Sequence, residues 1–142
     1  MILRALVVGL GSIGVRHLRL LREALPEADL RVLRHSGCRN DLPKEADDCL
    51  DSLDAAVAFA PQVAVISNPA PYHMDTAHAL AKAGSHLLVE KPLSSSIAGV
   101  ASLVELCSSR GQILQVGYNL RFLETLQSFR AELAAGAIGT VY

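Results

Sequence analysis

The sequence LRALVVGLGSIG, residues 3–14, decides the fold class because it joins an apolar run to a glycine-rich turn. Its first six residues are apolar apart from Arg4, as expected for a strand buried in a parallel sheet. Its last six residues follow the pattern GxGxxG. Helical spacing of apolar residues begins at Ser12 and continues to Leu25, and Pro26 then ends the predicted helix. The segment therefore predicts a buried strand, a tight turn and a helix.

The rest of the chain repeats this alternation of strand and helix patterns. The predicted strands are 30–33, 63–67, 86–89 and 113–116, and the predicted helices are 53–59 (capped by Ser52), 72–83, 97–110 and 124–135. Residues 35–48 are polar and predict a loop, whereas residues 138–142 resemble the start of a further strand. Strands separated by helices need crossover connections. The prediction is an α/β fold with a doubly wound parallel sheet in three αβα layers, with strand order 3-2-1-4-5-6.

Composition limits the classes of function. The chain has 142 residues, which suits one domain, and its formal net charge of −1 leaves no basic surface for nucleic acid or anionic membranes. The apolar N-terminus is short and interrupted by Gly9, so we predict a strand there and no signal peptide. Cys38, Cys49 and Cys107 are odd in number and show no metal-site or disulfide spacing, which favours a reducing, cytoplasmic location.

The glycine motif is the first candidate site. Gly9 permits the tight turn, Gly11 lets the backbone approach a pyrophosphate, and Gly14 allows the helix to pack closely on the strand. Ser12 and Ile13 begin the helix, whose N-terminal amides attract anions. Between a strand and a helix, the motif predicts a dinucleotide site; the alternative is a plain strand–helix turn with packing glycines.

Cofactor choice depends on the segment after the second predicted strand. An NAD site carries an acidic residue about 20 residues after the glycines, where it bonds the adenosine ribose. Here Arg34, His35 and Ser36 stand at that place, and none is a carboxylate. Arg34 and Ser36 can bind a 2′-phosphate, so we favour NADP over NAD. The alternative is that Arg34 is solvated and Asp41 returns from the loop to bond the ribose of NAD.

Two further motifs follow predicted strands at their carboxyl ends, where ligands of open α/β sheets bind. In the first, Ser67, Asn68 and Pro69 precede His73, and Asn68 is a candidate contact for the cofactor ribose. His73 is either functional or a local hydrogen-bond partner.

The second motif is Glu90-Lys91-Pro92. A lysine at the mouth of a dry crevice is suited to donate a proton or hydrogen bond to a reacting oxygen. The alternative is a solvated charged pair that ends the strand.

The order of these motifs resembles that of the Gfo/Idh/MocA oxidoreductase family. The matching segments are Gly9 to Gly14, Asn68-Pro69 with His73, Glu90-Lys91-Pro92, Gly117-Tyr118-Asn119-Leu120-Arg121-Phe122 and Gly136-Ala137-Ile138-Gly139. The resemblance implies an enzyme in which a Rossmann domain holds NAD(P) and a second α/β domain holds a sugar, cyclitol or nucleotide sugar. A hydride then moves between a substrate carbon and the nicotinamide.

The resemblance also implies roles for individual residues. Lys91 matches the family lysine that contacts the reacting oxygen, and Glu90 and Asn68 match residues near the nicotinamide ribose. Pro92 and Asn119 are further candidate cofactor contacts. Arg121 matches a residue at the junction of cofactor and substrate. We expect residues 1–136 to form the NAD(P)-binding domain and residues 137–142 to begin the substrate domain. The family's aspartate–histidine pair belongs to that second domain. One departure is Leu123-Glu124, where many relatives have His-Pro.

Two other functions are compatible with the glycine turn. A nucleotide-binding sensor or interaction domain would keep the glycine turn without hydride transfer. A methyltransferase would also use a glycine loop, but it leaves Glu90-Lys91-Pro92 unexplained. We further expect an apolar surface near Val116, Phe122 and Leu126 where a substrate domain would pack, and a homo-oligomer.

Overall fold

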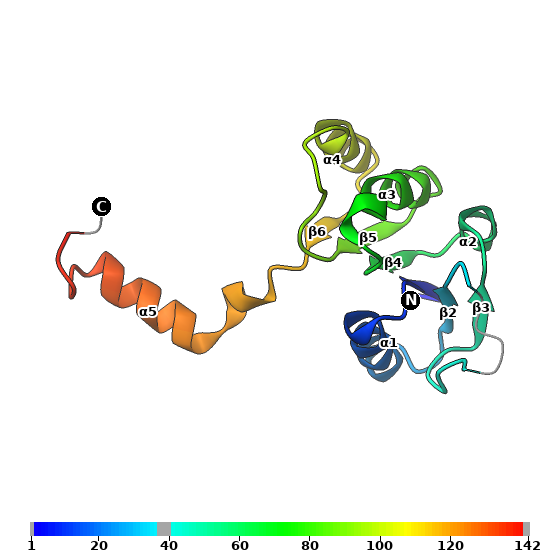
Figure 1. The fold of residues 1–142 in the computed structure, drawn as a ribbon, viewed down its shortest axis with the longest axis horizontal. Helices are drawn as coiled ribbons and strands as arrows, with labels where there is room; N and C mark the ends of the chain where they lie inside the picture. The colour runs from blue at the N-terminus through cyan, green and yellow to red at the C-terminus, as the bar shows by residue number, and fades with distance from the viewer. Residues whose placement is uncertain (1, 37–40, 141–142) are drawn as a thin grey trace.

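A computed structural model describes residues 2–36 and 41–140 (Figure 1). Its centre is a parallel sheet of six strands in the order β3-β2-β1-β4-β5-β6. The prediction counts residues 63–67 as the third strand, beside 30–33, and this is wrong: residues 63–66 pair with the strand at 4–8, and the unpredicted strand at 48–50 takes the third place. The strands are β1 (Arg4–Val8), β2 (Asp29–Leu33), β3 (Asp48–Leu50), β4 (Val63–Ile66), β5 (His86–Val89) and β6 (Leu114–Val116). The chain reverses its direction of travel across the sheet between β1 and β4, so ligands are expected at the carboxyl ends of these two strands.

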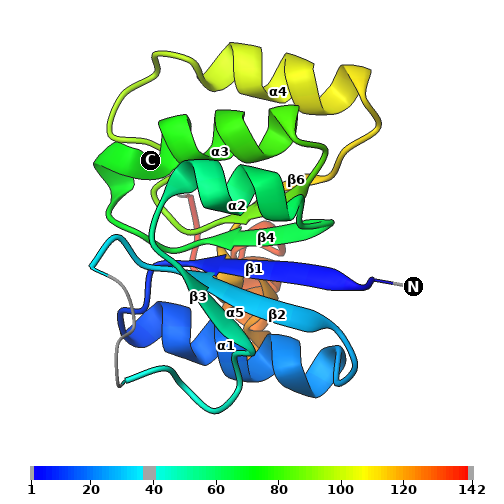
Figure 2. The same ribbon diagram turned by 90° about the vertical axis from the view of Figure 1, so that its right-hand side faces the viewer.

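Helices cover both faces of the sheet, as Figure 2 shows. Helix α1 (Ser12–Ala24) lies on one face. Helices α2 (Leu53–Phe59), α3 (His73–Lys82) and α4 (Val100–Ser109) lie on the other, and a short 3-10 helix, η1 (Ala70–Tyr72), leads into α3. These three layers confirm the doubly wound αβα class.

The alternation of side chains along β1 separates two cores. Ala5 and Val7 pack towards α1, whereas Leu6 and Val8 pack towards the three-helix face, and all four are at most 2% exposed. A strand segment buried on both faces needs apolar residues at every position, which explains the apolar run from Ala5 to Val8. Strand β1 ends at Val8, directly before Gly9, so it positions the glycine turn.

The structure departs from the sequence predictions in three places. Residues 48–50 form β3, although the sequence predicts a loop up to Asp48, because a three-residue edge strand carries too little periodicity to be detected. Helix α4 begins at Val100, three residues later than predicted, after Gly99 adopts a φ of 78°. Residues 138–140 form no strand, and Val141 and Tyr142 lie outside the described residues.

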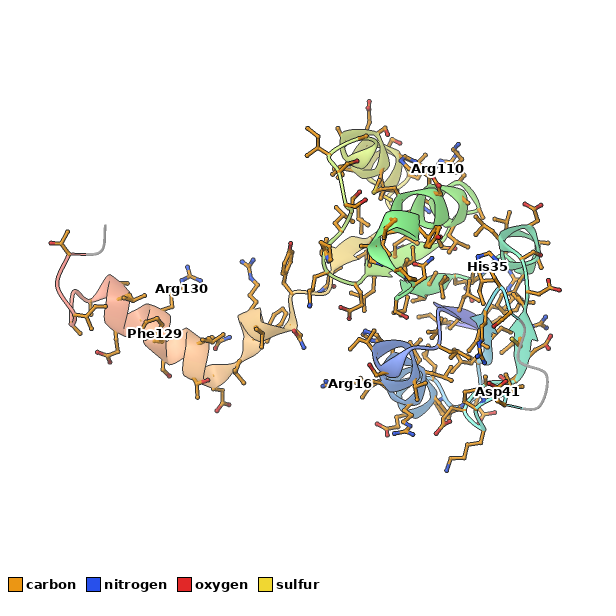
Figure 3. All side chains as sticks on the ribbon, viewed as in Figure 1. Arg16, His35, Asp41, Arg110, Phe129 and Arg130 are labelled. Carbon is orange, nitrogen blue, oxygen red and sulfur yellow. The ribbon has the colours of Figure 1, made fainter. Side chains whose placement is uncertain are left out.

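Residues 119–140, called the arm below, project away from the sheet and its helices (Figure 1). The arm contains a 3-10 helix, η2 (Asn119–Phe122), and helix α5 (Glu124–Ala134), which has no buried residue. Figure 3 shows Phe129 and Arg130 on α5, far from the sheet. Phe122 is 66% exposed and Leu126 43% exposed, which agrees with the apolar surface expected around them.

The cysteines differ from expectation. Cys49 in β3 is disulfide-bonded, so the prediction that no disulfide occurs was wrong. Cys107 is free and buried in α4. Among residues 2–36 and 41–140, no helix is long and apolar enough to cross a membrane. The same residues contain no group of three or more His, Cys, Asp or Glu side chains arranged to hold a metal ion.

Candidate functional site

The glycine turn between β1 and α1 is shaped by two close contacts and one opening. A Cβ atom on Gly14 would lie 2.0 Å from the carbonyl oxygen of Gly9, and one on Gly9 would lie 2.9 Å from the backbone nitrogen of Asn68. Gly9 also has a φ of 89°. At Gly11, by contrast, a Cβ would meet nothing within 4 Å. Gly9 and Gly14 therefore serve internal packing, whereas Gly11 faces an open space.

The N-terminus of α1 borders this space and is electrostatically suited to an anion. Gly11 is its N-cap residue with extended backbone angles, no side chain caps the helix, and its first turn contains no acidic residue. The first amides of a helix have no acceptor within the helix and carry partial positive charge. A diphosphate above Gly11 would accept from these amides, as at the N-termini of other nucleotide-binding helices.

Ser67 holds the glycine turn against β4. Its backbone amide donates to the carbonyl of Val8 (2.9 Å), and its hydroxyl donates to the same oxygen (2.8 Å), with the carbonyl of Gly9 at 3.3 Å. Since a hydroxyl has one hydrogen, Ser67 is already committed as a donor. Ser67 lines the site, but its hydrogen bonds join the end of β4 to the end of β1.

A hollow of about 330 Å³ lies beside the glycine turn at the carboxyl ends of β4 and β5. It gathers residues from segments far apart in the chain. Those predicted from the sequence are Ile13, Ser67, Asn68, His73, Glu90, Lys91, Pro92 and Asn119, and Ala70 completes the wall. The structure therefore brings together most residues of the predicted nicotinamide side.

His73 connects two walls of this hollow. Its side chain is 2% exposed, with Nε2 2.6 Å from the carbonyl oxygen of Asn68 and Nδ1 2.9 Å from that of Pro92. These contacts support the local hydrogen-bonding interpretation of His73. The imidazole joins the turn after β4 to the turn after β5.

Asn68 supplies an unused acceptor. Its Nδ2 donates to Thr76 Oγ1 over 3.3 Å, whereas its Oδ1 is buried with no partner among the described residues. Buried acceptors without a donor are rare in folded proteins. This oxygen is enclosed by protein, so a ligand in the hollow does not reach it; the open space at Gly11 beside the uncapped start of α1 is what fits the diphosphate of a nicotinamide nucleotide.

Glu90 has a partner that sequence reasoning missed. Its Oε1 lies 2.7 Å from His17 Nε2, and the two side chains are 15% and 17% exposed. A Cβ on Gly117 would lie 3.1 Å from the same carboxylate. His17 stands three residues after Gly14, one helical turn along α1, and this spacing was the available signal. Glu90 is thus held between α1 and the turn after β6.

Lys91 lies at the edge of the hollow. The residue is exposed, and its side chain makes no hydrogen bond or ion pair within residues 2–36 and 41–140. The desolvation expected for Lys91 is not provided by these residues, because Lys91 is exposed. The ammonium group is free to meet a ligand.

The remaining predicted residues lie outside the hollow. Arg34, His35 and Ser36 follow β2, and Arg34 Nη1 lies 2.5 Å from Asp41 Oδ2. The hydrogen bond from Arg34 holds the pKa of the Asp41 carboxyl below its ordinary value. Pro69 is exposed in the turn after β4.

Arg121 lies in η2 and lines a hollow between η2 and α5 with Leu120 and Phe122. It is not among the residues around the nicotinamide-side hollow. The arm carries Arg121 away from the sheet, so its predicted place at the junction of cofactor and substrate stays a prediction.

The fold and this site together define a dinucleotide-binding Rossmann domain. The model of a family described as "Oxidoreductase family, NAD-binding Rossmann fold" matches residues 3–118, and the chain belongs to this family, Gfo/Idh/MocA. The chain is 30% identical over 129 residues to an inositol 2-dehydrogenase of Acidiphilium cryptum, covering 86% of this chain and 38% of that relative. It thus spans about two fifths of the length of the curated relatives it matches.

Two solved structures share the fold. Scyllo-inositol dehydrogenase from Lactobacillus casei, with bound NAD(H) and scyllo-inositol, has a TM-score of 0.76 at 20% identity, covering 98% of this chain and 43% of that chain. The WlbA dehydrogenase from Chromobacterium violaceum, in complex with NADH and UDP-GlcNAcA, has a TM-score of 0.78 at 21% identity, covering 99% of this chain and 42% of that chain.

Proposed function

We propose that this chain is the NAD(P)-binding domain of an oxidoreductase that transfers a hydride between a nicotinamide cofactor and a sugar, cyclitol or nucleotide sugar. The observation that carries the proposal is the open space at Gly11, above an uncapped helix N-terminus and beside the nicotinamide-side hollow. The names of the relatives, inositol dehydrogenases and a dehydrogenase bound to a nucleotide sugar, support the substrate class.

Different residues bind different parts of the cofactor in this proposal. The amides at the start of α1 bind the diphosphate, and Ile13 forms part of the wall beside it. Asn68 lines the hollow in which the nicotinamide ribose would lie. When bound, the nicotinamide supplies the hydride donor or acceptor.

Lys91 is the proposed catalytic residue. Its Nζ donates to the oxygen on the reacting carbon and holds the proton which that oxygen gains or loses. The open rim around Lys91 is where the substrate would enter. Residues 1–136 form the cofactor domain in this proposal, and residues 137–142 begin a substrate domain that would cover the rim.

The arm also supports the proposal of a second domain. Its exposed apolar side chains include Phe122 (66%), Phe129 (55%) and Ile138 (63%), and such surfaces mark places where another domain or subunit packs. We propose that the substrate domain covers the arm in the whole protein, which is cytoplasmic and homo-oligomeric. Self-association of the isolated chain at high concentration, measured by analytical ultracentrifugation, is the expected result; a strict monomer would contradict it.

Gly11→Val tests the proposed cofactor site. The extended backbone at Gly11 (φ −68°, ψ −179°) accepts a β-branched residue, and the new side chain enters space that the protein leaves empty. We expect NADH binding, followed by fluorescence titration, to weaken by at least about tenfold while the urea midpoint stays unchanged. Ala101→Val, at an exposed position of α4, is the matched control and should bind NADH as the parent chain does. Equal binding by both variants would refute the proposed site.

Lys91→Ala tests the enzymatic role. The 142-residue chain should bind NADH weakly and turn over no polyol. In a protein carrying both domains, Lys91→Ala should lose most of its rate and keep its NADH affinity, whereas Lys82→Ala should change neither. Full activity of Lys91→Ala would favour the sensor or interaction domain instead.

A further inference from the structure

The ion pair between Arg34 and Asp41 lies on the adenosine side of the proposed cofactor site. The amide of Gly9 donates to the carbonyl of Leu33 (2.9 Å), so Arg34 is one residue beyond the contact that joins β2 to the glycine turn. Arg34 Nη1 lies 2.5 Å from Asp41 Oδ2, and the side chains are 38% and 63% exposed. Figure 3 shows Asp41 on the β2–β3 side of the molecule, opposite the arm.

This pairing changes what Arg34 can bind. A free guanidinium at the end of the second strand attracts the 2′-phosphate of NADP through bidentate hydrogen bonds. Here the guanidinium already has a carboxylate partner. A 2′-phosphate must either displace Asp41 or approach a second negative charge at close range, and like charges at such distances repel. A ribose hydroxyl is neutral, and it donates readily to a carboxylate.

We propose that Asp41 determines cofactor preference: by occupying Arg34 and offering a carboxylate to the ribose, it selects NAD(H) against NADP(H). The inference rests on the proposed function, because it assumes that the adenosine lies beside β2. It replaces the preference for NADP drawn from Arg34 and Ser36, since the sequence did not reveal that Arg34 is paired. Asp41 takes the place of the acidic residue that NAD sites carry at the end of the second strand.

A second carboxylate nearby provides a control. Asp51 directly follows β3, and Leu50 pairs with Leu33 in the sheet register, so Asp51 lies at the same edge as Arg34. Asp51 is exposed and makes no ion pair within residues 2–36 and 41–140. Asp51→Asn therefore removes the same charge from the same edge without releasing Arg34.

The test measures dissociation constants of NADH and NADPH for four chains: the parent, Asp41→Asn, Arg34→Gln and Asp51→Asn. We expect the parent to bind NADH more tightly than NADPH. Asp41→Asn should tighten NADPH binding by about tenfold and weaken NADH binding severalfold, because the guanidinium becomes free for the phosphate. Arg34→Gln should leave NADPH binding weak. Asp51→Asn should change the ratio of the two constants by less than about twofold, since exposed charges are screened.

The outcomes separate the inference from the proposed function. A parent chain that prefers NADPH, or an unchanged ratio in Asp41→Asn, would overturn the role of Asp41 while leaving a cofactor site in place. An equal change in Asp41→Asn and Asp51→Asn would show a general charge effect and would also overturn it. A parent chain that binds neither nucleotide would overturn the proposed function and the inference together. Because both side chains are partly exposed, the urea midpoints of all four chains should agree closely.

Discussion

The sheet with its helices and the arm both carry large apolar side chains but differ in how far these are buried. Leu103 on α4 is 0% exposed, whereas Leu126 on α5 is 43% exposed and Phe129 on the same helix 55%. Both helices are short, with 10 residues in α4 and 11 in α5. The difference lies in what covers them, since α4 packs into the core of the three-helix face and the arm projects from it (Figure 1).

The contrast shows where stability and function reside in this chain. Isolated helices of about this length are marginal in water, so a helix gains most of its stability from the face that it buries. The residues around the proposed cofactor site are held by buried strands and by contacts such as that of His73 with Asn68 and Pro92. The arm has no comparable support within the described residues. We therefore expect substitutions in the two regions to differ strongly in effect.

The largest effect is expected at the glycine turn. Gly14→Ala places a Cβ 2.0 Å from the carbonyl oxygen of Gly9, a backbone atom that cannot move without separating α1 from β1. We expect a loss of about 4 kcal/mol or more in the free energy of unfolding, measured by urea denaturation. Gly11→Ala adds the same methyl group to open space and should cost almost nothing. Similar losses in both variants would show that the turn tolerates no side chain at all.

A matched pair of leucines compares the two regions directly. Leu103→Ala removes a fully buried side chain and should cost about 2–5 kcal/mol. Leu126→Ala removes an exposed one and should change the free energy of unfolding by less than about 0.5 kcal/mol. Urea denaturation of both variants checks the difference. A large cost for Leu126→Ala would mean that α5 packs on the sheet in solution.

The pair of His17 and Glu90 should matter more for cofactor binding than for folding. His17→Ala leaves the Glu90 carboxylate without its partner at 2.7 Å, so Glu90 can move into the hollow. We expect the dissociation constant of NADH to rise by about tenfold, the effect of losing a charge-assisted hydrogen bond. His17→Gln retains a donor and should restore part of the affinity. Equal affinity in the parent and His17→Ala would mean that Glu90 needs no support from α1.

The smallest effect concerns Asp47, which joins the loop before β3 to β2 and α1. Its Oδ2 accepts from the amide of Leu30 (2.7 Å) and from Arg22 Nη2 (2.6 Å). Burial acts to raise the pKa of Asp47, but these two hydrogen bonds outweigh it and hold the pKa below the ordinary 3.8. Asp47→Asn should cost about 1 kcal/mol at neutral pH, because the side chain is 51% exposed and the charge is screened.

The pH dependence of that effect has a definite sign. A carboxyl whose pKa is lower in the folded state stabilises the fold fully above its unfolded value and loses this contribution as the pH falls through the folded value. The stability difference between the parent and Asp47→Asn should therefore shrink below about pH 4. Glu27→Gln, an exposed carboxyl without an ion pair among the described residues, should show no such trend. If the stability difference between the parent and Asp47→Asn persists at low pH, packing and not the charge of Asp47 causes it.

Much of the fold was predictable because it follows from local patterns. The apolar run before Gly9, the helical spacing after Ser12 and the Ser52 cap each involve residues close in sequence, and the structure confirms all three. The edge strand β3 was not predicted. It has three residues, and its pairing with β2 depends on contacts across a loop.

The sequence alone determined the alternation of strands and helices, the glycine turn and the motifs that end β4 and β5, because periodicity and glycine spacing reflect the backbone itself. Only the tertiary structure decided which side chains meet: His17 with Glu90, His73 with two carbonyls, and Arg34 with Asp41. These partners lie between 5 and 73 positions apart in the chain. Their approach depends on how the helices pack on the sheet, and no local pattern records that packing.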